Sequence, residues 1–128
     1  MRRLEWVSLS NFTVLCTHQI DAAYWHEWEM FHLPGGNQIN LILNLPLIGA
    51  GLLAMRRILL SPDSATWGQA YLITLGLLVV ILHTGFFVAG YAQFTQPMSY
   101  LLIAATGLLS IWQWQLVRAG RKTRATAC

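Results

Sequence analysis

The sequence predicts an all-α protein, a four-helix transmembrane bundle with both termini cytoplasmic. Hydrophobic residues make up 55% of the 128 residues and charged residues only 10%, whereas a soluble domain averages about 25% charged residues. Four apolar stretches each approach the roughly 20 residues that a spanning helix needs. All eight Lys and Arg residues fall on one side of this layout, which sets its orientation by the positive-inside rule.

The length and the charge pattern limit the function classes. A chain of 128 residues is expected to form a single integral membrane domain over residues 1–128. It has no basic stripe with interleaved aromatic residues, so nucleic acid is not an expected partner. The expected partners are the lipid bilayer and a lipid or apolar substrate. Because the chain is small, association with a second copy of itself or with a partner membrane subunit is also expected.

The first predicted span, residues 6–31, is the most polar of the four. Its first half is apolar enough to enter a membrane easily. Its second half carries six ionisable residues: His18, Asp21, His26, Glu27, Glu29 and His32. Because charged groups facing lipid cost several kcal/mol, such residues face the bundle interior or a wet cavity and usually mark a functional site.

The other three spans are more apolar. The second, residues 38–57, contains Pro46, which membrane helices tolerate because neighbouring groups satisfy the freed carbonyl. The third, residues 68–91, is the clearest apolar run, and the fourth covers residues 97–117.

The connectors contain turn-forming residues. Leu-Pro-Gly-Gly-Asn at 33–37 and Ser-Pro-Asp-Ser at 61–64 are strong breaks. The short connector 93–97 predicts that the third and fourth spans form an antiparallel hairpin.

The positive residues define the cytoplasmic side. They precede the first span, follow the second and follow the fourth: Arg2, Arg3, Arg56, Arg57, Arg118, Arg121, Lys122 and Arg124. The connectors on the opposite side, 31–37 and 91–97, contain no Lys or Arg. This asymmetry predicts that both termini are cytoplasmic.

A helical projection and the helical rise predict a polar pocket. At 100° per residue, His18, Asp21 and Glu29 share one face, while Glu27 points roughly opposite if the helix is regular. Counted from the outer connectors, Asp21 lies roughly 15 Å deep, His18 roughly 20 Å and His83 roughly 13 Å. Asn44 lies at roughly 10 Å. These groups are therefore expected to meet in the outer half of the membrane, with His26, Glu29 and His32 at the mouth.

Two imidazoles and a carboxylate suit zinc or another divalent metal. The predicted metal ligands are His18, Asp21 and His83. A metal with an open position lowers the pKa of its bound water, and a nearby carboxylate can act as a general base. The predicted catalytic residues are Glu27, His26 and Glu29.

The same residues allow other interpretations. His18 and Asp21 can form a structural hydrogen-bonded pair, and His83 can be a packing residue. Asn44 can connect helices, as polar residues commonly do in membranes. Two histidines on different helices could also ligate haem, although the Cys-x-x-Cys-His attachment motif is absent. A metal-dependent hydrolase and a non-catalytic binding or accessory protein therefore both remain open.

The first predicted span also resembles known sequences. His18-Gln19-Ile20-Asp21-Ala22 followed by His26-Glu27-Trp28 resembles small bacterial membrane proteins of uncharacterised function that read His-Glu-x-Asp-Ala, then His-Glu-Trp-Arg. The layout is more distantly similar to the membrane family named for a His-x-x-Glu-Glu motif. The resemblance implies a multi-pass protein of the bacterial inner (cytoplasmic) membrane. Gln19 and Glu29 depart from the pattern, and Asn44 stands where a histidine is expected.

Overall fold

The computed structural model describes residues 2–61 and 66–125, with only the backbone of residues 124 and 125. Within these ranges the chain is all-α. It forms five helices: α1 (Arg3–Tyr24), α2 (Glu27–Met30), α3 (Asn37–Leu60), α4 (Thr66–Val88) and α5 (Pro97–Ala125). The predicted break at 61–64 lies largely outside the described residues.

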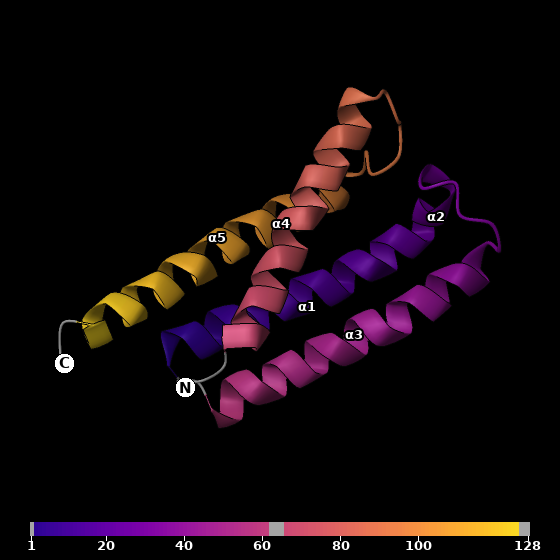
Figure 1. The fold of residues 1–128 in the computed structure, drawn as a ribbon. Helices are drawn as coiled ribbons and strands as arrows, with labels where there is room; N and C mark the ends of the chain where they lie inside the picture. Colours follow the sequence, from indigo (N-terminus) through magenta and orange to yellow (C-terminus); the bar gives the residue numbers. More distant parts are fainter. Residues whose placement is uncertain (1, 62–65, 126–128) are drawn as a thin grey trace.

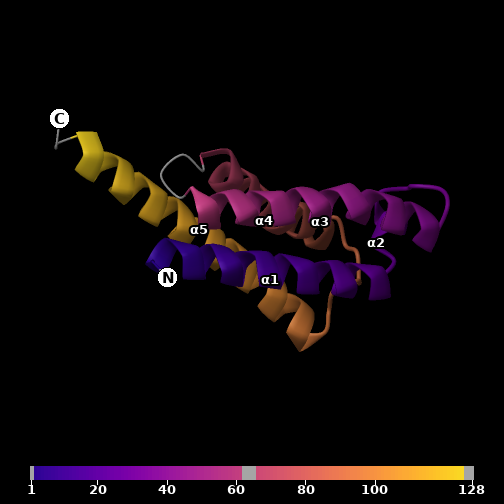
Figure 2. The same ribbon diagram turned by 90° about the horizontal axis from the view of Figure 1, so that it is seen from below.

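Helix α1 is the central element of the bundle. It packs against α3, α4 and α5, while α3 packs on α4 and α4 on α5. Figures 1 and 2 show α1 and α3 running side by side, with α5 crossing α1. The ends that carry the basic residues, namely the start of α1 and the ends of α3 and α5, lie at one end of the bundle (Figure 1). Helix α2 and the α4–α5 loop lie at the other.

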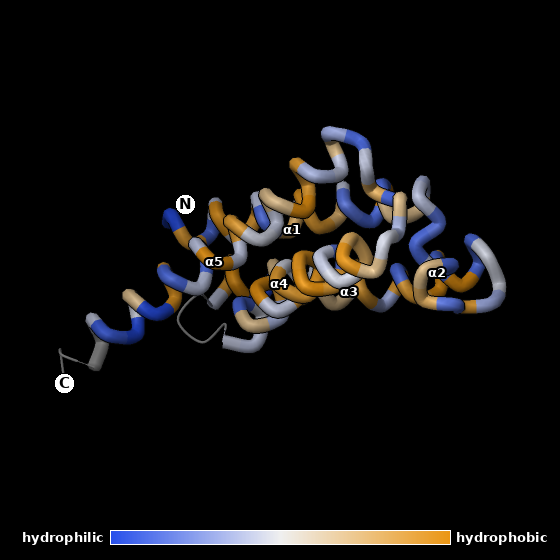
Figure 3. Tube along the Cα trace, turned by 90° about the horizontal axis from the view of Figure 1, so that it is seen from above, coloured by the Kyte–Doolittle hydropathy of each residue, from blue (hydrophilic) through white to orange (hydrophobic). Residues whose placement is uncertain are grey.

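Three of the described helices are long and apolar enough to cross a membrane: Asn37–Leu60, Thr66–Val88 and Pro97–Thr123. Their outer faces carry large exposed apolar side chains, including Leu45 at 78% and Val88 at 85% exposure. Figure 3 shows the apolar middle turns of these helices and the hydrophilic last turns of α5. An apolar surface this extensive indicates contact with lipid. The chain is therefore a multi-pass membrane protein.

The predicted first span is interrupted in the structure. Helix α1 has 22 residues, about 33 Å at the helical rise, so it is long enough to span. Unlike those three helices, it contains no stretch apolar enough to make it a candidate span. It ends at Tyr24, and the single turn of α2 follows. The regular helix assumed over 6–31 is not observed.

A Schellman motif ends α4. Gly90 has φ 85°, which glycine adopts without steric cost. The N–H of Gly90 donates to the Phe87 carbonyl and the N–H of Tyr91 to the Phe86 carbonyl, both at 3.1 Å. The Tyr91 and Phe86 rings pack 5.5 Å apart, the hydrophobic contact that usually accompanies this motif. The motif directs the following loop back over the bundle.

A network of buried amides and hydroxyls links α1 to α4 and α5 near the termini. We call it the amide layer, and it comprises Ser8, Asn11, Gln69, Ser110 and Gln113, all almost fully buried. Asn11 Nδ2 donates to Gln113 Oε1 at 2.8 Å and to Ser110 Oγ at 3.1 Å. Gln113 Nε2 donates to Gln69 Oε1 at 2.7 Å. Hydrogen bonds of this kind hold membrane helices together.

We expect Asn11→Leu to destabilise the bundle. The substitution leaves Gln113 and Ser110 without their α1 partner, and a buried polar group left unpaired costs about 1–3 kcal/mol. Reversible unfolding in mixed micelles measures the loss. Thr13→Leu is the matched control, because the exposed Thr13 hydroxyl bonds to the Leu9 carbonyl of its own helix. Equal stability of the two variants would contradict a role for the amide layer.

Candidate metal centre

A left-handed residue between α1 and α2 redirects the chain. His26 has φ 54° and ψ 48°, a conformation that costs a non-glycine residue about 1–3 kcal/mol. Because of this reversal, Glu27 begins a new helical turn and points toward α4 instead of away from the bundle. Its carboxylate oxygen Oε1 lies 3.6 Å from His83 Nε2.

The position of His83 on α4 fixes its tautomer. Its Nδ1 lies 2.8 Å from the Val79 carbonyl oxygen, which can only accept a hydrogen bond. Nδ1 therefore carries the proton, and Nε2 presents a lone pair. That Nε2 atom is buried and has no hydrogen-bond partner, since 3.6 Å to Glu27 is too long for one. A carbonyl bonded to the far nitrogen is how proteins usually orient a metal-binding histidine.

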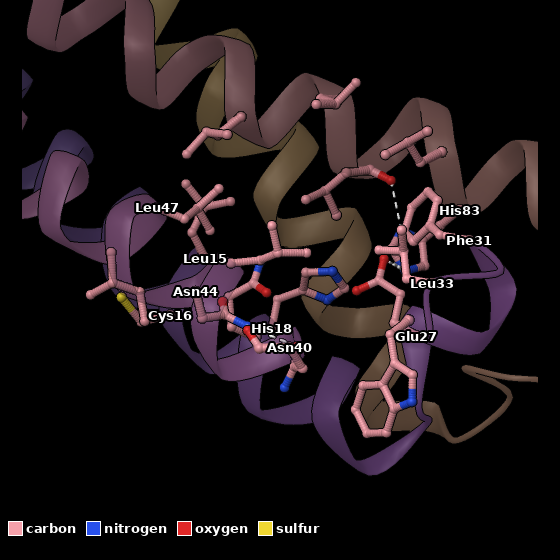
Figure 4. Close-up of a pocket in the computed structure, with 18 of the residues that line it drawn as sticks. Leu15, Cys16, His18, Glu27, Phe31, Leu33, Asn40, Asn44, Leu47 and His83 are labelled. Carbon is pink, nitrogen blue, oxygen red and sulfur yellow. Dashed lines mark hydrogen bonds and ion pairs between the residues drawn. The ribbon is translucent and has the colours of Figure 1, made fainter. Parts of the chain in front are cut away.

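His18 on α1 completes the group. Its side chain is 1% exposed, and its Nδ1 is also without a hydrogen-bond partner. The His18 and His83 ring centroids lie 4.8 Å apart at an interplanar angle of 78°. One ligand atom each from His18, Glu27 and His83 lies within 4.8 Å of the other two. Figure 4 shows the His18 ring and the Glu27 carboxylate pointing toward each other.

The distances are close to those of a metal site. Zinc bonds to nitrogen and oxygen are about 2.0–2.2 Å long, so tetrahedral ligand atoms stand roughly 3.4 Å apart. The 3.6 Å between Glu27 and His83 is near this value, and the His18 ligand atom lies within 4.8 Å of both. Two histidines and one carboxylate form the ligand set of several zinc enzymes and of non-haem iron sites. The group could hold a metal.

The electrostatics of the group also favour a cation. Glu27 lies in α2, outside the candidate spans, and burial raises its pKa to about 7, with a contribution from the negative charge of Asp21. The ionised carboxylate is therefore destabilised in the absence of a positive partner. The lone pair of His83 faces this carboxylate, so a bound cation would relieve both.

An aromatic side chain covers the two histidines. Phe94 lies in the α4–α5 loop with φ 60° and is fully buried. Its ring lies 4.3 Å from that of His83 in an edge-to-face arrangement and 5.8 Å from that of His18. No sequence pattern indicated Phe94, because its contacts depend on the return of the loop after Gly90.

Asp21, a predicted ligand, lies beside the group but outside it. Its Oδ1 accepts a hydrogen bond of 3.1 Å from Ser99 Oγ, which in turn accepts one of 3.1 Å from Trp25 Nε1. Its Oδ2 is buried without a hydrogen-bond partner. Glu27, predicted as a proton carrier, occupies the place expected for Asp21. Glu27 takes this position instead of Asp21 because the helix is interrupted at His26, which turns the Glu27 side chain toward the inside of the bundle.

The residues predicted at the mouth of the pocket lie at the surface. The His26 Nδ1 and Glu29 Oε1 atoms are 3.6 Å apart, and their side chains are 59% and 66% exposed. His32 is exposed as well. None of these three side chains lines the cavity described next.

A cavity of about 230 Å³ adjoins the three-residue group. Its walls come from α1, α2, α3 and α4, and most of them are leucine, isoleucine, valine or phenylalanine. His18, Glu27 and His83 contribute the polar surface at one part of it, and Asn40 and Asn44 contribute that of α3. The sequence prediction that Asn44 shares a pocket with the histidines agrees with this lining.

Comparison with protein families identifies the family of this chain. The family described as a family of unknown function (DUF6713) matches residues 4–120. The chain belongs to DUF6713. The match includes His18, Glu27, His83 and Phe94, and so the whole candidate centre of this DUF6713 protein lies within the family region. Searches of curated proteins and of solved structures find no match.

We expect Phe94→Ala to destabilise the DUF6713 protein more than any neighbouring exposed substitution. Removing a buried phenylalanine ring typically costs about 3–5 kcal/mol, and here it also opens the covered side of His83. Thermal unfolding in detergent measures the effect. Val88→Ala is the control, since Val88 is 85% exposed and is expected to shift the midpoint little. Indistinguishable midpoints would mean that Phe94 does not close the site.

Proposed function

We propose that this protein binds a divalent metal ion through His18, Glu27 and His83. The observation that carries the proposal is the convergence of two unpartnered histidine nitrogen sites and a partly buried carboxylate, one each from α1, α2 and α4. Three protein ligands leave one tetrahedral position open, as in catalytic zinc sites. Asp21 is a second carboxylate available as a metal ligand in this proposal, because its Oδ2 is buried without a hydrogen-bond partner.

The open position beside an apolar cavity supports a metal-dependent enzyme that acts on a lipid or another apolar substrate. The metal would polarise a substrate oxygen or lower the pKa of a bound water. Glu27, in this arrangement, holds the metal rather than moving protons. His26 and Glu29 lie outside the cavity, so in this proposal they transfer protons at its entrance.

The proposed setting is a four-span bundle in the bacterial inner membrane, formed by the single domain of residues 1–128. Helix α1 is the additional span, because its Ser8 and Asn11 side chains are bonded to α4 and α5 inside the bundle and its length suffices. Both termini are then cytoplasmic by the positive-inside rule. The first-helix resemblance to bacterial membrane proteins and to the His-x-x-Glu-Glu family supports this setting.

A non-catalytic binding or accessory role is the second candidate. The cavity lining favours this role. Among the described residues, Glu27 is the one carboxylate that lines the cavity. If Glu27 binds the metal, no carboxylate remains in the cavity to act as a general base. Haem is a poorer occupant than a metal ion. The cavity of about 230 Å³ is smaller than the roughly 300–1,000 Å³ of usual cofactor pockets.

The metal content of purified protein tests the proposal. Protein isolated with a histidine-free affinity tag is expected to contain, or to take up after chelation, about one equivalent of zinc, cobalt or iron. His83→Ala and Glu27→Ala are expected to lose most of it, because each removes one of three ligands. Glu29→Ala, which removes an exposed carboxylate outside the cavity, and His26→Asn, which keeps a residue type that tolerates the left-handed conformation, are the controls and retain it. A well-folded wild-type protein that refuses all three metals would overturn the proposal.

Reporter fusions test the four-span layout. Green fluorescent protein fused after residue 60 or at the C-terminus is expected to fluoresce, because both positions are cytoplasmic in the proposal. Alkaline phosphatase fused after residue 36 or residue 93 is expected to be active outside the membrane. An N-terminal tag decides whether α1 spans, because only the side of the N-terminus depends on it: the tag is cytoplasmic if α1 crosses, and labelling of the tag from outside by a membrane-impermeant reagent would show that α1 does not span.

A further inference from the structure

The cavity beside the proposed metal centre is elongated along the helices. On α4 its lining runs from Leu75 to His83, and on α3 from Asn40 to Ile48, which is about 12 Å in each case at the helical rise. The proposed ligand group lies at one end of this length, since His83 is the last α4 residue in the lining. The deep end is bordered by apolar side chains such as Phe12 and Leu75. A polar head and an apolar tail are therefore separated along the cavity axis.

The size of the cavity limits what can lie in it. Its volume of about 230 Å³ lies below the roughly 300–1,000 Å³ of pockets that hold drug-sized ligands, which favours a narrow chain over a fused ring system. Its length of about 12 Å, from the helical rise, matches an extended alkyl chain of about eight carbons with a small head group. A full-length membrane acyl chain exceeds this length.

The cavity reaches the apolar surface of the bundle. Four of its apolar lining residues are also exposed: Leu43 at 49%, Leu78 at 44%, Phe31 at 40% and Leu33 at 37%. On a helix face that contacts lipid, such an opening admits molecules dissolved in the bilayer rather than polar solutes from water. The occupant is therefore expected to be amphiphilic.

A second polar group on α3 faces the cavity. Asn44 Nδ2 donates to the Asn40 carbonyl oxygen at 3.0 Å and to Asn40 Oδ1 at 2.8 Å, which fixes the orientation of the Asn44 amide. Asn44 Oδ1 is consequently an acceptor, and it is buried without a partner. A buried acceptor of this kind costs free energy unless a donor reaches it. In Figure 4, Asn44 and Asn40 lie on one side of His18, with Glu27 and His83 on the other.

We propose that the cavity binds an amphiphile with one acyl or alkyl chain of about eight carbons, whose head group combines a metal-binding oxygen with an N–H or O–H donor for Asn44 Oδ1. The head-group contact rests on the proposed metal centre, whereas the chain site does not. Amides and hydroxylated acids of medium chain length have this chemistry. The chain occupies the space between Phe12, Leu47 and Leu75.

The test uses octanohydroxamic acid, which has an eight-carbon chain and an N–H beside two metal-binding oxygens. A form with a diazirine at the chain end is irradiated with zinc-loaded protein in nanodiscs of phosphatidylethanolamine and phosphatidylglycerol. Labelling is expected at the deep end of the cavity, on Phe12, Ile48 or Leu75. Excess octanohydroxamic acid should suppress it by at least about tenfold, while acetohydroxamic and hexadecanohydroxamic acids suppress it far less, because burial of methylenes supplies the affinity.

Matched variants separate the contributions. Leu47→Trp fills the cavity and is expected to abolish suppressible labelling. Leu45→Trp keeps it, because Leu45 is 78% exposed and does not line the cavity. Asn44→Leu is expected to remove a preference of about tenfold for octanohydroxamic acid over its N-methyl derivative, since the lost acceptor no longer selects a donor.

The outcomes separate the two proposals. Labelling confined to lipid-facing residues, or unaffected by Leu47→Trp, overturns the chain site whether or not metal is bound. Cavity labelling that octanohydroxamic acid suppresses in a protein with no metal content supports the chain site and overturns the metal centre. Equal suppression by the two-carbon, eight-carbon and sixteen-carbon acids overturns the chain-length assignment, and equal binding of the N-methyl derivative overturns the role of Asn44.

Discussion

The structure depends on one constraint, which is that the polar side chains of α1 have to be satisfied inside the bundle. In hydrocarbon an unpaired polar group costs several kcal/mol, and α1 is the long helix whose composition does not qualify it as a candidate span. Asn11 is paired with α5 at one end, and Asp21 is paired with Ser99 of α5 at the other. These pairings place α1 in the centre, in contact with α3, α4 and α5.

The same pairings position the candidate centre. Because Asp21 and Trp25 are both tied to Ser99, the last turn of α1 is fixed against α5 and the chain must leave it there. His26 absorbs the change of direction in a left-handed conformation, at a cost that the surrounding contacts offset. The turn that follows brings Glu27 to His83. Metal ligation would thus depend on a helix end that is stabilised from a different helix.

Much of this architecture could be predicted from the sequence. The apolar runs predicted the three candidate spans to within a few residues at most ends, and the breaks at 33–37 and 93–97 fall between helices as expected. The helical rise placed His18 roughly 20 Å and His83 roughly 13 Å deep, and their rings are 4.8 Å apart. The depth of His18 was overestimated because α1 ends at Tyr24 and not at residue 31.

The remainder depended on contacts that no local pattern encodes. Glu27 could not be assigned to the group from the sequence, because a helical projection is valid only while the helix continues. The helix is interrupted at His26, whose left-handed backbone conformation is uncommon for a residue other than glycine. Phe94 could not be identified, since its position follows from the loop after Gly90. The amide layer was missed for a related reason. Ser8, Asn11, Gln69, Ser110 and Gln113 are ordinary residues in their own segments and become a network only when three helices pack.

The two polar regions of the bundle differ in a way that argues for different roles. In the amide layer, Asn11 and Gln113 are bonded to each other and to Ser110 and Gln69, and Gln69 Nε2 is the unpartnered atom among its described side chains. At the other end, His18, Asp21, Asn44 and His83 each leave one buried atom without a partner. A fold that needed these residues only for packing would gain stability by pairing them or by replacing them with apolar side chains. Three of these groups, His18, Asn44 and His83, line one cavity, and the proposed metal and amphiphile would complete their coordination and hydrogen bonds.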